Sequence, residues 1–555
     1  MSLNFSKKEK QLKINIKIFS KEKFLSKEFL FPVISGLLLG FSFPPFPFFI
    51  LAFFSLVPLF FVIEKKNTLS GVNKTVYLFA FFFNLITLYW VGSWTKEADP
   101  FLKISGIVLL FFNPLLFLIP ATLFYLAKKY VNPKIAFYLL PFFWVFYEYI
   151  YSVTEFRFPW LTLGNSQAHF TSFIQISEFI GVYGISIIII YVNLFLFFAI
   201  KQYSRHKDLV KSLKFSGIAL ALFVFPLIYG LSVNAENFKG ESIRVGIIQP
   251  NFNPWKKWDA ENLDEQIDVY FNLSEKAIKE GAELLVFPET ALPVYLTSFS
   301  YSRELNRFFK FCDTNKVPIL TGMPDLNIYN SYAPKDAKQF RNSKRKYTTY
   351  NSVYLFNPGK REIQKYHKTL LVPFGEKVPY VEYLPFLGKL LQWEVGISSW
   401  NVGEGAKTLT TEIKNRKIKL GAAVCIESIY PEYISKFVNK GAEALFIVTN
   451  DSWYGKSSGP YQHESIAILR AVENRRYVVR AANGGISCII SPNGKILSQT
   501  DLFVRTELTG NVKLLKNKTF YTLHPYIVPF FAVFITSIVL VFILFLRLKL
   551  YFIRN

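Results

Sequence analysis

Eight stretches of apolar residues, most of them close to 20 residues long, constrain this chain more than any other feature of its sequence. They cover roughly residues 28–43, 46–63, 75–95, 104–127, 135–153, 180–199, 213–233 and 525–546. A helix of about 20 apolar residues spans the hydrocarbon core of a bilayer. The sequence therefore predicts a polytopic α-helical membrane protein of about eight spans, with most spans before a long polar stretch and the last one after it.

Composition and charge agree with a membrane location. Of the 555 residues, 51% are hydrophobic and 18% are aromatic, which is too apolar for a soluble chain of this length. A formal net charge of +25 is also typical of nucleic-acid binders, but here the Lys and Arg residues lie between the apolar stretches. We therefore expect the lipid bilayer, and no nucleic acid, as a partner.

The distribution of positive charge predicts the orientation. Basic clusters occupy the N-terminal tail, the connections around residues 65–74, 128–134 and 201–207, and the C-terminal tail, and they alternate with less basic connections. Connections rich in Lys and Arg stay in the cytoplasm. We therefore expect cytoplasmic termini and four regions: a basic tail at 1–27, a membrane domain of seven spans at 28–235, an outward-facing domain at 236–520, and a last span with a cytoplasmic tail at 521–555.

Within residues 236–520 the apolar runs become short and alternate with amphipathic stretches. This pattern is typical of an α/β domain, in which helices pack over a sheet. Strands are predicted at residues 243–249, 283–289, 317–322, 352–357, 417–425, 444–449 and 486–492, and helices at 263–281, 303–315, 431–440 and 463–482.

Several residues of this domain could carry chemistry. Cys425 and Glu289 end predicted strands, as do Asn450 and Asp451, and strand ends present side chains without burying them fully. Lys368 precedes an apolar run in YHKTLLVPFGE. Each residue alone has an ordinary explanation, as a core cysteine, a capping or surface carboxylate, or a lysine whose stem covers apolar surface.

Taken together, the cysteine, the glutamate and the lysine form a complete set for acyl transfer. A thiol with an ordinary pKa of about 8.5 is mostly protonated at neutral pH and needs a base. A partly buried carboxylate can serve as that base, and a fixed ammonium can stabilise an oxyanion.

Four motifs carry a resemblance to a known superfamily. FPET (287–290), HKTLLVPFGE (367–376), AAVCIES (422–428) and TNDSWYGKSSGPYQH (449–463) resemble the nitrilase superfamily of carbon–nitrogen hydrolases, whose Glu-Lys-Cys triad lies on an αββα sandwich. The order of segments resembles the apolipoprotein N-acyltransferases, bacterial inner-membrane members with one outer domain between the last two of their membrane helices.

The resemblance implies residue roles. Glu289 would be the general base, Lys368 the oxyanion stabiliser and Cys425 the nucleophile. Ile426 departs from the pattern, because many relatives carry Tyr there. Supporting roles fall to Glu376 and Glu427, and positions near the substrate to Trp258, Trp453 and Tyr454.

The resemblance also implies a reaction. An acyl chain from the sn-1 position of a phospholipid, typically phosphatidylethanolamine, would pass to the cysteine as a thioester and then to the α-amino group of a diacylglyceryl-cysteine apolipoprotein. The implied enzyme is a monomer on the periplasmic side of the inner membrane. Two alternatives remain at this stage: a membrane-anchored nitrilase or amidase acting on a small soluble substrate, and a transporter or receptor whose outer domain only binds.

Moving an acyl chain of about 15 methylenes into water would cost about 12 kcal/mol, so the site must open toward the bilayer. Residues 381–393 are unusually apolar for an outward-facing connection, and we expect a mobile lid there that contacts substrate through Leu384, Phe386 and Trp393. An ordinary buried connection is the other interpretation.

Cysteine and histidine usage argues against a metal. Cys312, Cys425 and Cys488 are widely spaced and odd in number, so at least one thiol stays free. The sequence contains no CxxC pattern, and no pair of its histidines has the spacing of a zinc site. We therefore expect no metal and no other cofactor.

Overall fold

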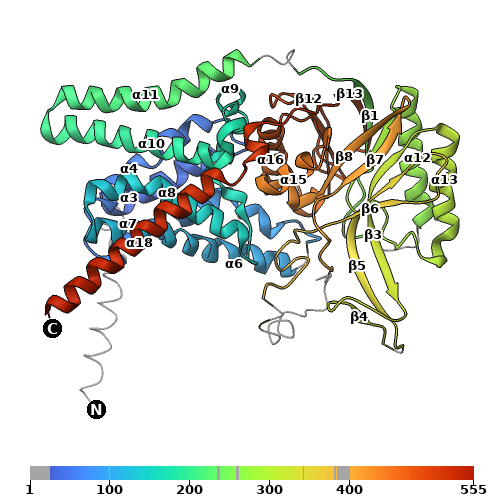
Figure 1. Cartoon of the computed structure of the whole chain (residues 1–555), viewed down its shortest axis with the longest axis horizontal. Coiled ribbons are helices and arrows are strands. Elements are labelled where there is room, and N and C mark those ends of the chain that lie inside the picture. Colours follow the sequence, from blue (N-terminus) through green and yellow to red (C-terminus); the bar gives the residue numbers. More distant parts are fainter. Residues whose placement is uncertain are drawn as a thin grey trace.

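The computed structural model describes residues 26–98, 100–233, 238–257, 262–341, 343–380, 383 and 400–554. A bundle of long helices packs end-on against an α/β sandwich (Figure 1). Most of the predicted basic tail lies outside the described residues, and so do Trp258, Leu384, Phe386 and Trp393 with most of the predicted lid.

Each of the eight predicted apolar stretches contains helix. The bundle consists of α3 (Lys27–Phe41), η2 (Phe49–Phe53), α4 (Val57–Ile63), α5 (Leu69–Thr87), η3 (Tyr89–Gly92), α6 (Pro100–Leu116), α7 (Leu118–Tyr130), α8 (Pro133–Val153), η4 (Pro159–Leu161), η5 (Leu163–Gln167), α9 (Thr171–Ile174), α10 (Ser177–His206), α11 (Leu209–Ser232) and α18 (Ile527–Arg554). Among the described residues, six helices are long and apolar enough to cross a membrane, with α6 and α7 taken as one. The shorter α3 and the η2–α4 pair supply the other two predicted segments.

The second apolar stretch is broken, and a neighbouring helix repairs the break. Asn193 of α10 accepts a hydrogen bond from Leu56 N–H at 2.8 Å and donates one to Ala52 O at 2.8 Å. Backbone groups in a bilayer need protein partners, since no water is available. This bridge therefore lets two short helices replace one continuous span.

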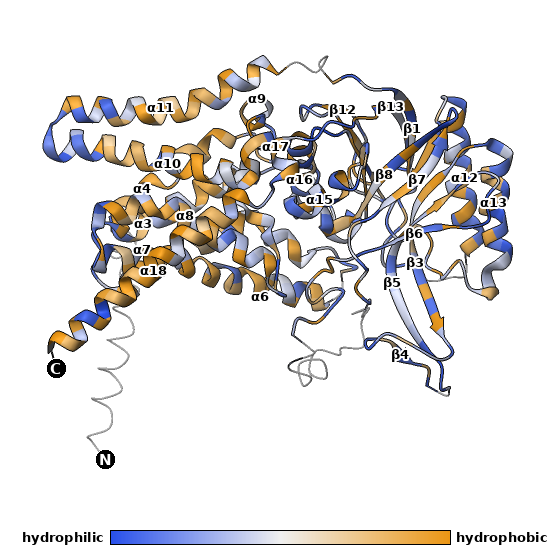
Figure 2. Cartoon of the chain, viewed as in Figure 1, coloured by the Kyte–Doolittle hydropathy of each residue, from blue (hydrophilic) through white to orange (hydrophobic). Residues whose placement is uncertain are grey.

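Basic connections of the bundle meet at the end that lies away from the sandwich (Figure 2). The Lys128 ammonium donates to Glu64 O at 2.5 Å and to Lys66 O at 2.7 Å. The Glu64 carboxylate in turn pairs with Lys201 and, at 2.9 Å, with Arg205. Charge therefore joins the C-terminal parts of α7 and α10 to the connection that follows α4, at one end of the bundle.

The sandwich consists of two sheets with parallel central strands. The first has the order β13-β1-β2-β3-β5-β4, with β6 also beside β5, and the second the order β12-β11-β10-β9-β8-β7. The bounds are β1 Ser242–Gln249, β2 Leu284–Phe287, β3 Ile319–Tyr329, β4 Lys338–Gln339, β5 Lys346–Phe356, β6 Gln364–His367, β7 Thr408–Ile413, β8 Arg416–Val424, β9 Ala444–Thr449, β10 Val478–Ala482, β11 Cys488–Ile490, β12 Ile496–Gln499 and β13 Thr506–Lys513.

Helices cover the outer faces of both sheets, which confirms the predicted αββα sandwich (Figure 1). The helical elements are α12 (Leu263–Lys279), η8 (Phe299–Tyr301), α13 (Ser302–Asn315), η9 (Cys425–Ile429), α15 (Pro431–Asn439), η10 (Asp451–Tyr454), α16 (Ser458–Asn474) and α17 (Phe520–Leu523). Helices α12 and α13 lie on the far side from the bundle, whereas α15 and α16 lie between the second sheet and the bundle. Every residue of α16 except Tyr461 is buried.

The predicted helix at 463–482 is wrong in its second half. Helix α16 ends at Asn474, and Arg475 adopts a left-handed φ of 47°. Residues Val478–Ala482 form β10, a central strand between β9 and β11. The β-branched Val-Val pair favours a strand, and pairing with β9 outweighs the helical pattern of the residues before it.

The sandwich also completes a helix of the bundle. Helix α10 is interrupted at Gly181, where φ is 61° and where a Cβ would lie 2.3 Å from the Tyr521 ring. The next N–H group, that of Val182, donates to the Glu473 carboxylate of α16 at 3.0 Å. Glu473 thus satisfies a backbone group that the interruption leaves unpaired.

Candidate active site

Cys425 stands on a sharp turn at the end of β8. Its φ is +50°, in the left-handed region that residues with a Cβ adopt at a cost of about 1 kcal/mol or more. Cys425 is the first residue of η9, and it is half-buried. The turn carries the thiol beyond the end of the sheet.

Glu289 comes from the first sheet, two residues after β2. Thr290, which follows it, also has a left-handed φ, of +44°. On the neighbouring strand β3, a Cβ on Gly322 would lie 2.5 Å from Glu289 Cα. Gly322 therefore allows the loop of Glu289 to lie directly against β3, where Gly322 N–H donates to Pro288 O at 3.1 Å.

Lys368 lies between two carboxylates. Its Nζ is 3.4 Å from Glu289 Oε1 and 2.8 Å from Glu376 Oε2, and its side chain is 1% exposed. Burial alone would lower the pKa of Lys368, but the Glu376 and Glu289 carboxylates outweigh burial and raise it far above its ordinary value. The ammonium therefore stays charged throughout the physiological range.

Asn351 of β5 organises this cluster, although the sequence analysis did not identify it. Its Nδ2 donates to Glu289 Oε1 at 2.7 Å and to Glu376 Oε1 at 3.0 Å. Its backbone O accepts from Lys368 N–H at 2.8 Å. The amide therefore holds both carboxylates beside the ammonium.

The Cys425 thiol holds its proton tightly. Burial raises the pKa of the thiol well above its ordinary value, and the Glu289 carboxylate raises it further, whereas the Lys368 ammonium lowers it. At neutral pH the thiol therefore attacks only if a base removes its proton. Glu289 is close enough to influence the sulfur, which makes it the candidate base.

Glu427 is fully buried and ties the loop of Lys368 to the turn of Cys425. Its Oε1 accepts from Thr369 N–H at 2.7 Å and from Tyr366 OH at 2.6 Å. Its Oε2 accepts from Val424 N–H at 2.8 Å. With these partners Glu427 holds the loop of Lys368 and the turn of Cys425 together.

Glu427 predicts a pH-dependent stability. Burial raises the pKa of Glu427 to about 7 from 4.5, despite the hydrogen bonds from Tyr366 and Val424. Because the folded pKa is raised, this contribution to stability is complete below pH 4.5 and is lost as the pH rises through about 7. At about 1.4 kcal/mol per pH unit, we expect the free energy of unfolding of wild type, relative to Glu427→Gln, to fall by about 3 kcal/mol over that window.

Unfolding of both proteins in the same detergent at pH 4.5 and pH 7.5 measures this difference. Glu432 and Glu464, whose pKa values burial also raises to about 7, titrate in both proteins and therefore cancel. A difference that stays constant across the window would contradict the assignment to Glu427.

The membrane half reaches the site through η3. The Tyr454 ring, just past β9, contacts the Trp90 ring edge-on with centroids 4.7 Å apart. The adjacent Trp453 contacts Trp255 at 4.8 Å, and its carbonyl accepts from Ser93 Oγ. Trp453 and Tyr454, two of the residues predicted to lie near the substrate, are thus found at the junction between the bundle and the sandwich.

Lys257 is a second buried cation beside Glu289, and the sequence analysis passed over it in favour of its neighbour Trp258. It is 3% exposed, and in the described part of the chain its ammonium has one hydrogen bond, of 3.5 Å to Thr290 Oγ1. Burial lowers the pKa of Lys257 to about 7, against the opposing effect of Glu289. The signal in the sequence is a lysine within KKWD, a pattern too short to be distinctive.

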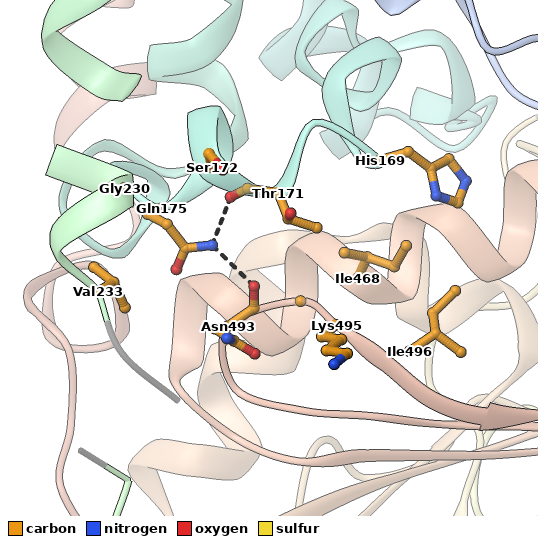
Figure 3. A pocket seen from close by; sticks show the side chains of 11 residues that line it. His169, Thr171, Ser172, Gln175, Gly230, Val233, Ile468, Asn493, Lys495 and Ile496 are labelled. Atoms are coloured by element: carbon orange, nitrogen blue, oxygen red, sulfur yellow. Dashed lines mark hydrogen bonds between the residues drawn. The ribbon is translucent and has the colours of Figure 1, made fainter. Parts of the chain in front are cut away.

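A cavity of about 320 Å³, lined by none of these residues, lies beside Ile468 of α16 (Figure 3). Its lining includes His169 and Gln175 from the membrane half and Ile468, Asn493 and Lys495 from the sandwich. Gln175 Nε2 donates to Asn493 O at 2.9 Å, which joins the two walls.

The other two thiols are buried and free: Cys312 packs in α13 and Cys488 in β11.

The sequence matches two known families along most of its length. Residues 35–195 match the apolipoprotein N-acyltransferase N-terminal domain, and residues 244–515 match carbon-nitrogen hydrolases. An apolipoprotein N-acyltransferase of Chlorobaculum tepidum is 34% identical over 519 residues, which are 91% of this chain and 95% of that protein. One from Geobacter metallireducens is 32% identical, over 89% of this chain and 91% of that protein.

Solved structures similar to this chain cover about half of it. An amidase from Nesterenkonia sp. has a TM-score of 0.35 and 16% identity, over 52% of this chain and 94% of its own. Nit3 of Saccharomyces cerevisiae, a member of branch 10 of the nitrilase superfamily, has a TM-score of 0.35 and 18% identity, over 53% of this chain and 96% of its own.

Proposed function

Because the chain belongs to the apolipoprotein N-acyltransferase family, we propose that it transfers a fatty acyl chain from a phospholipid to the N-terminal α-amino group of diacylglyceryl-cysteine apolipoproteins. The observation that carries the mechanism is the buried group of Glu289, Lys368 and Glu376 beside the Cys425 thiol. The match of residues 35–195 to the N-terminal domain of the family favours this function over a membrane-anchored amidase acting on a small soluble substrate.

In the first half-reaction, Glu289 takes the thiol proton while the sulfur attacks the sn-1 ester carbonyl of the lipid. A C–S bond forms, and the carbonyl oxygen gains negative charge beside the Lys368 ammonium. The C–O bond to glycerol then breaks, and Glu289 returns the proton to the departing glycerol oxygen. A lysophospholipid leaves, and Cys425 holds the acyl chain as a thioester.

In the second half-reaction, the α-amino group of the apolipoprotein attacks the thioester carbonyl. A C–N bond forms, the C–S bond breaks, and Glu289 moves the proton from the amine to the departing sulfur. Splitting the transfer lets two bulky lipids use one site in turn, and a thioester is reactive enough for an amine to open.

We also propose the orientation. The basic connections joined at the far end of the bundle would face the cytoplasm by the positive-inside rule. The sandwich would then face the periplasm, and the junction formed by Trp90 and Tyr454 would lie near the outer surface of the inner membrane. That position suits a site that receives acyl chains directly from the bilayer. We further propose that the enzyme works as a monomer.

The decisive experiment is to incubate the purified protein with a phosphatidylethanolamine that carries different acyl chains at sn-1 and sn-2, and to measure its intact mass. We expect an increase equal to the sn-1 chain, mapped to Cys425 and absent in Cys425→Ala. Adding a diacylglyceryl-cysteinyl peptide should remove it. An adduct on another residue, or N-acylation of the peptide by Cys425→Ala, would refute the proposal. Parallel reactions with phosphatidylglycerol and phosphatidylcholine test the headgroup preference.

A further inference from the structure

A chain of buried polar side chains runs from the second sheet to the backbone of the nucleophile. Ser428 Oγ donates to Cys425 O at 2.8 Å and lies 2.9 Å from His463 Nε2. His463 Nδ1 lies 2.9 Å from Asp451 Oδ1, and Arg480 pairs with the other oxygen of Asp451. All four residues are at most 3% exposed.

The hydrogen-bond partners link the chain from Arg480 to Cys425 O. Burial would raise the pKa of Asp451, but Arg480 and His463 outweigh burial and hold it far below its ordinary value, so the carboxylate only accepts. His463 Nδ1 lies beside this carboxylate and 3.2 Å from Arg480 Nη2. On its other side Nε2 lies 2.9 Å from Ser428 Oγ and 3.2 Å from Cys425 O. The Ser428 hydroxyl and the His463 ring thus converge on Cys425 O.

Holding the Cys425 carbonyl in place also fixes the direction of the Ile426 N–H group, which belongs to the same peptide. In a planar trans peptide the C=O and N–H groups point in opposite directions, so Ile426 N–H points away from Ser428 and His463. Cys425 itself is in a strained left-handed conformation, which persists only if the surroundings impose it. A rotation of this peptide would change the direction of the Ile426 N–H group.

These residue types suggest a serine hydrolase triad, but the geometry excludes it. Ser428 is 0% exposed and gives its proton to Cys425 O, so its oxygen cannot reach a substrate. The segment GKSSG at residues 455–459 fits the GxSxG pattern of serine hydrolases. Its Ser457 is the N-cap of α16 and accepts from Gly459 N–H at 3.4 Å.

We propose that Ser428 and His463, anchored by Asp451 and Arg480, are positioning residues that hold the Cys425–Ile426 peptide in the orientation needed for acyl transfer. The proposal rests on the function proposed above and adds a means by which the membrane half acts on the site. Trp160 of η4 packs on the His463 ring with centroids 5.3 Å apart. Trp160 Nε1 also donates to Gln462 Oε1 at 2.8 Å, beside His463 on α16.

The test compares two reactions of the same sulfur in the full-length protein. Acyl transfer from phosphatidylethanolamine, or from a p-nitrophenyl ester, passes through an oxyanion, whereas alkylation by iodoacetamide does not. We expect Ser428→Ala and His463→Gln to slow acylation about 100-fold, which is typical of a misplaced oxyanion donor. Alkylation of Cys425 should stay within about threefold of wild type. Ser428→Thr should restore most of the acylation.

Matched controls separate positioning from packing. Ser435 of α15 is also 0% exposed and donates to a backbone oxygen, Pro431 O, at 3.1 Å, so Ser435→Ala makes the same change away from Cys425. His169, which is exposed and bonds Ser465 Oγ at 2.8 Å, provides His169→Gln as a control for the same chemical change at another site. Both controls should keep both rates.

Equal losses of acylation and alkylation in Ser428→Ala and His463→Gln would indicate a structural role and overturn the proposal, as would no loss in either reaction. If wild type reacts with the p-nitrophenyl ester but not with the phospholipid, the lipid function fails while the positioning test still stands on the ester.

Discussion

Replacing Glu289 with Gln is expected to slow formation of the acyl-enzyme by about 10³- to 10⁴-fold, the upper part of the range for general-base catalysis. The physical reason is the thiol of Cys425, whose pKa burial and Glu289 hold above its ordinary value. Without a base, only the rare ionised fraction reacts. The residual rate of the variant should therefore rise about tenfold per pH unit through the neutral range, while that of wild type changes little.

Rapid-quench measurement of the acyl-enzyme by mass, from pH 6 to pH 9, tests this expectation. Glu304→Gln is a suitable control, because Glu304 is also buried but belongs to α13 on the far side of the first sheet. A variant that keeps more than a tenth of the wild-type rate, or whose rate is independent of pH, would show that another group removes the thiol proton.

Replacing Lys368 with Met is expected to abolish acyl transfer and also to destabilise the fold by about 3–5 kcal/mol. Removing the ammonium leaves the Glu289 and Glu376 carboxylates, which now share it, buried without a cation. Breaking a buried ion pair from one side has a cost of this size, because the remaining charge is desolvated and uncompensated.

A second substitution separates the two effects. In Lys368→Met/Glu376→Gln only one buried carboxylate, that of Glu289, remains without a cation. The double variant should therefore regain about half of the free energy of unfolding that Lys368→Met loses. Acylation should not recover, since no cation faces the oxyanion. Chemical unfolding in detergent gives the first quantity and the acyl-enzyme assay the second. Recovery of activity in the double variant would mean that Lys368 acts only by neutralising Glu376.

The membrane half was predictable because its signal is local. A run of apolar residues specifies a buried helix with little help from the rest of the chain, and each predicted stretch contains helix. The details that depend on partners were not predictable. The broken helix pair η2–α4 depends on Asn193, which is more than 130 residues away, and the strand β10 depends on pairing with β9.

The candidate site divides in the same way. The glutamate, lysine and cysteine could be identified from motifs that keep each residue beside its strand end. Asn351 and the link from Asp451 through His463 to Ser428 could not, because they join strands and helices that meet only in the folded sandwich. A left-handed φ at Cys425 has no local signature either, since the residue type favours other conformations.

Helix α16, buried along nearly its whole length, limits which fragments of this enzyme can fold separately. A fragment comprising the sandwich alone would present to water the face of α16 that now meets the bundle, and a fragment comprising the bundle alone would leave Val182 N–H of α10 without its partner Glu473. Neither fragment is an autonomous module. Chimeras that combine the bundle of one homologue with the sandwich of another should therefore be inactive or aggregate.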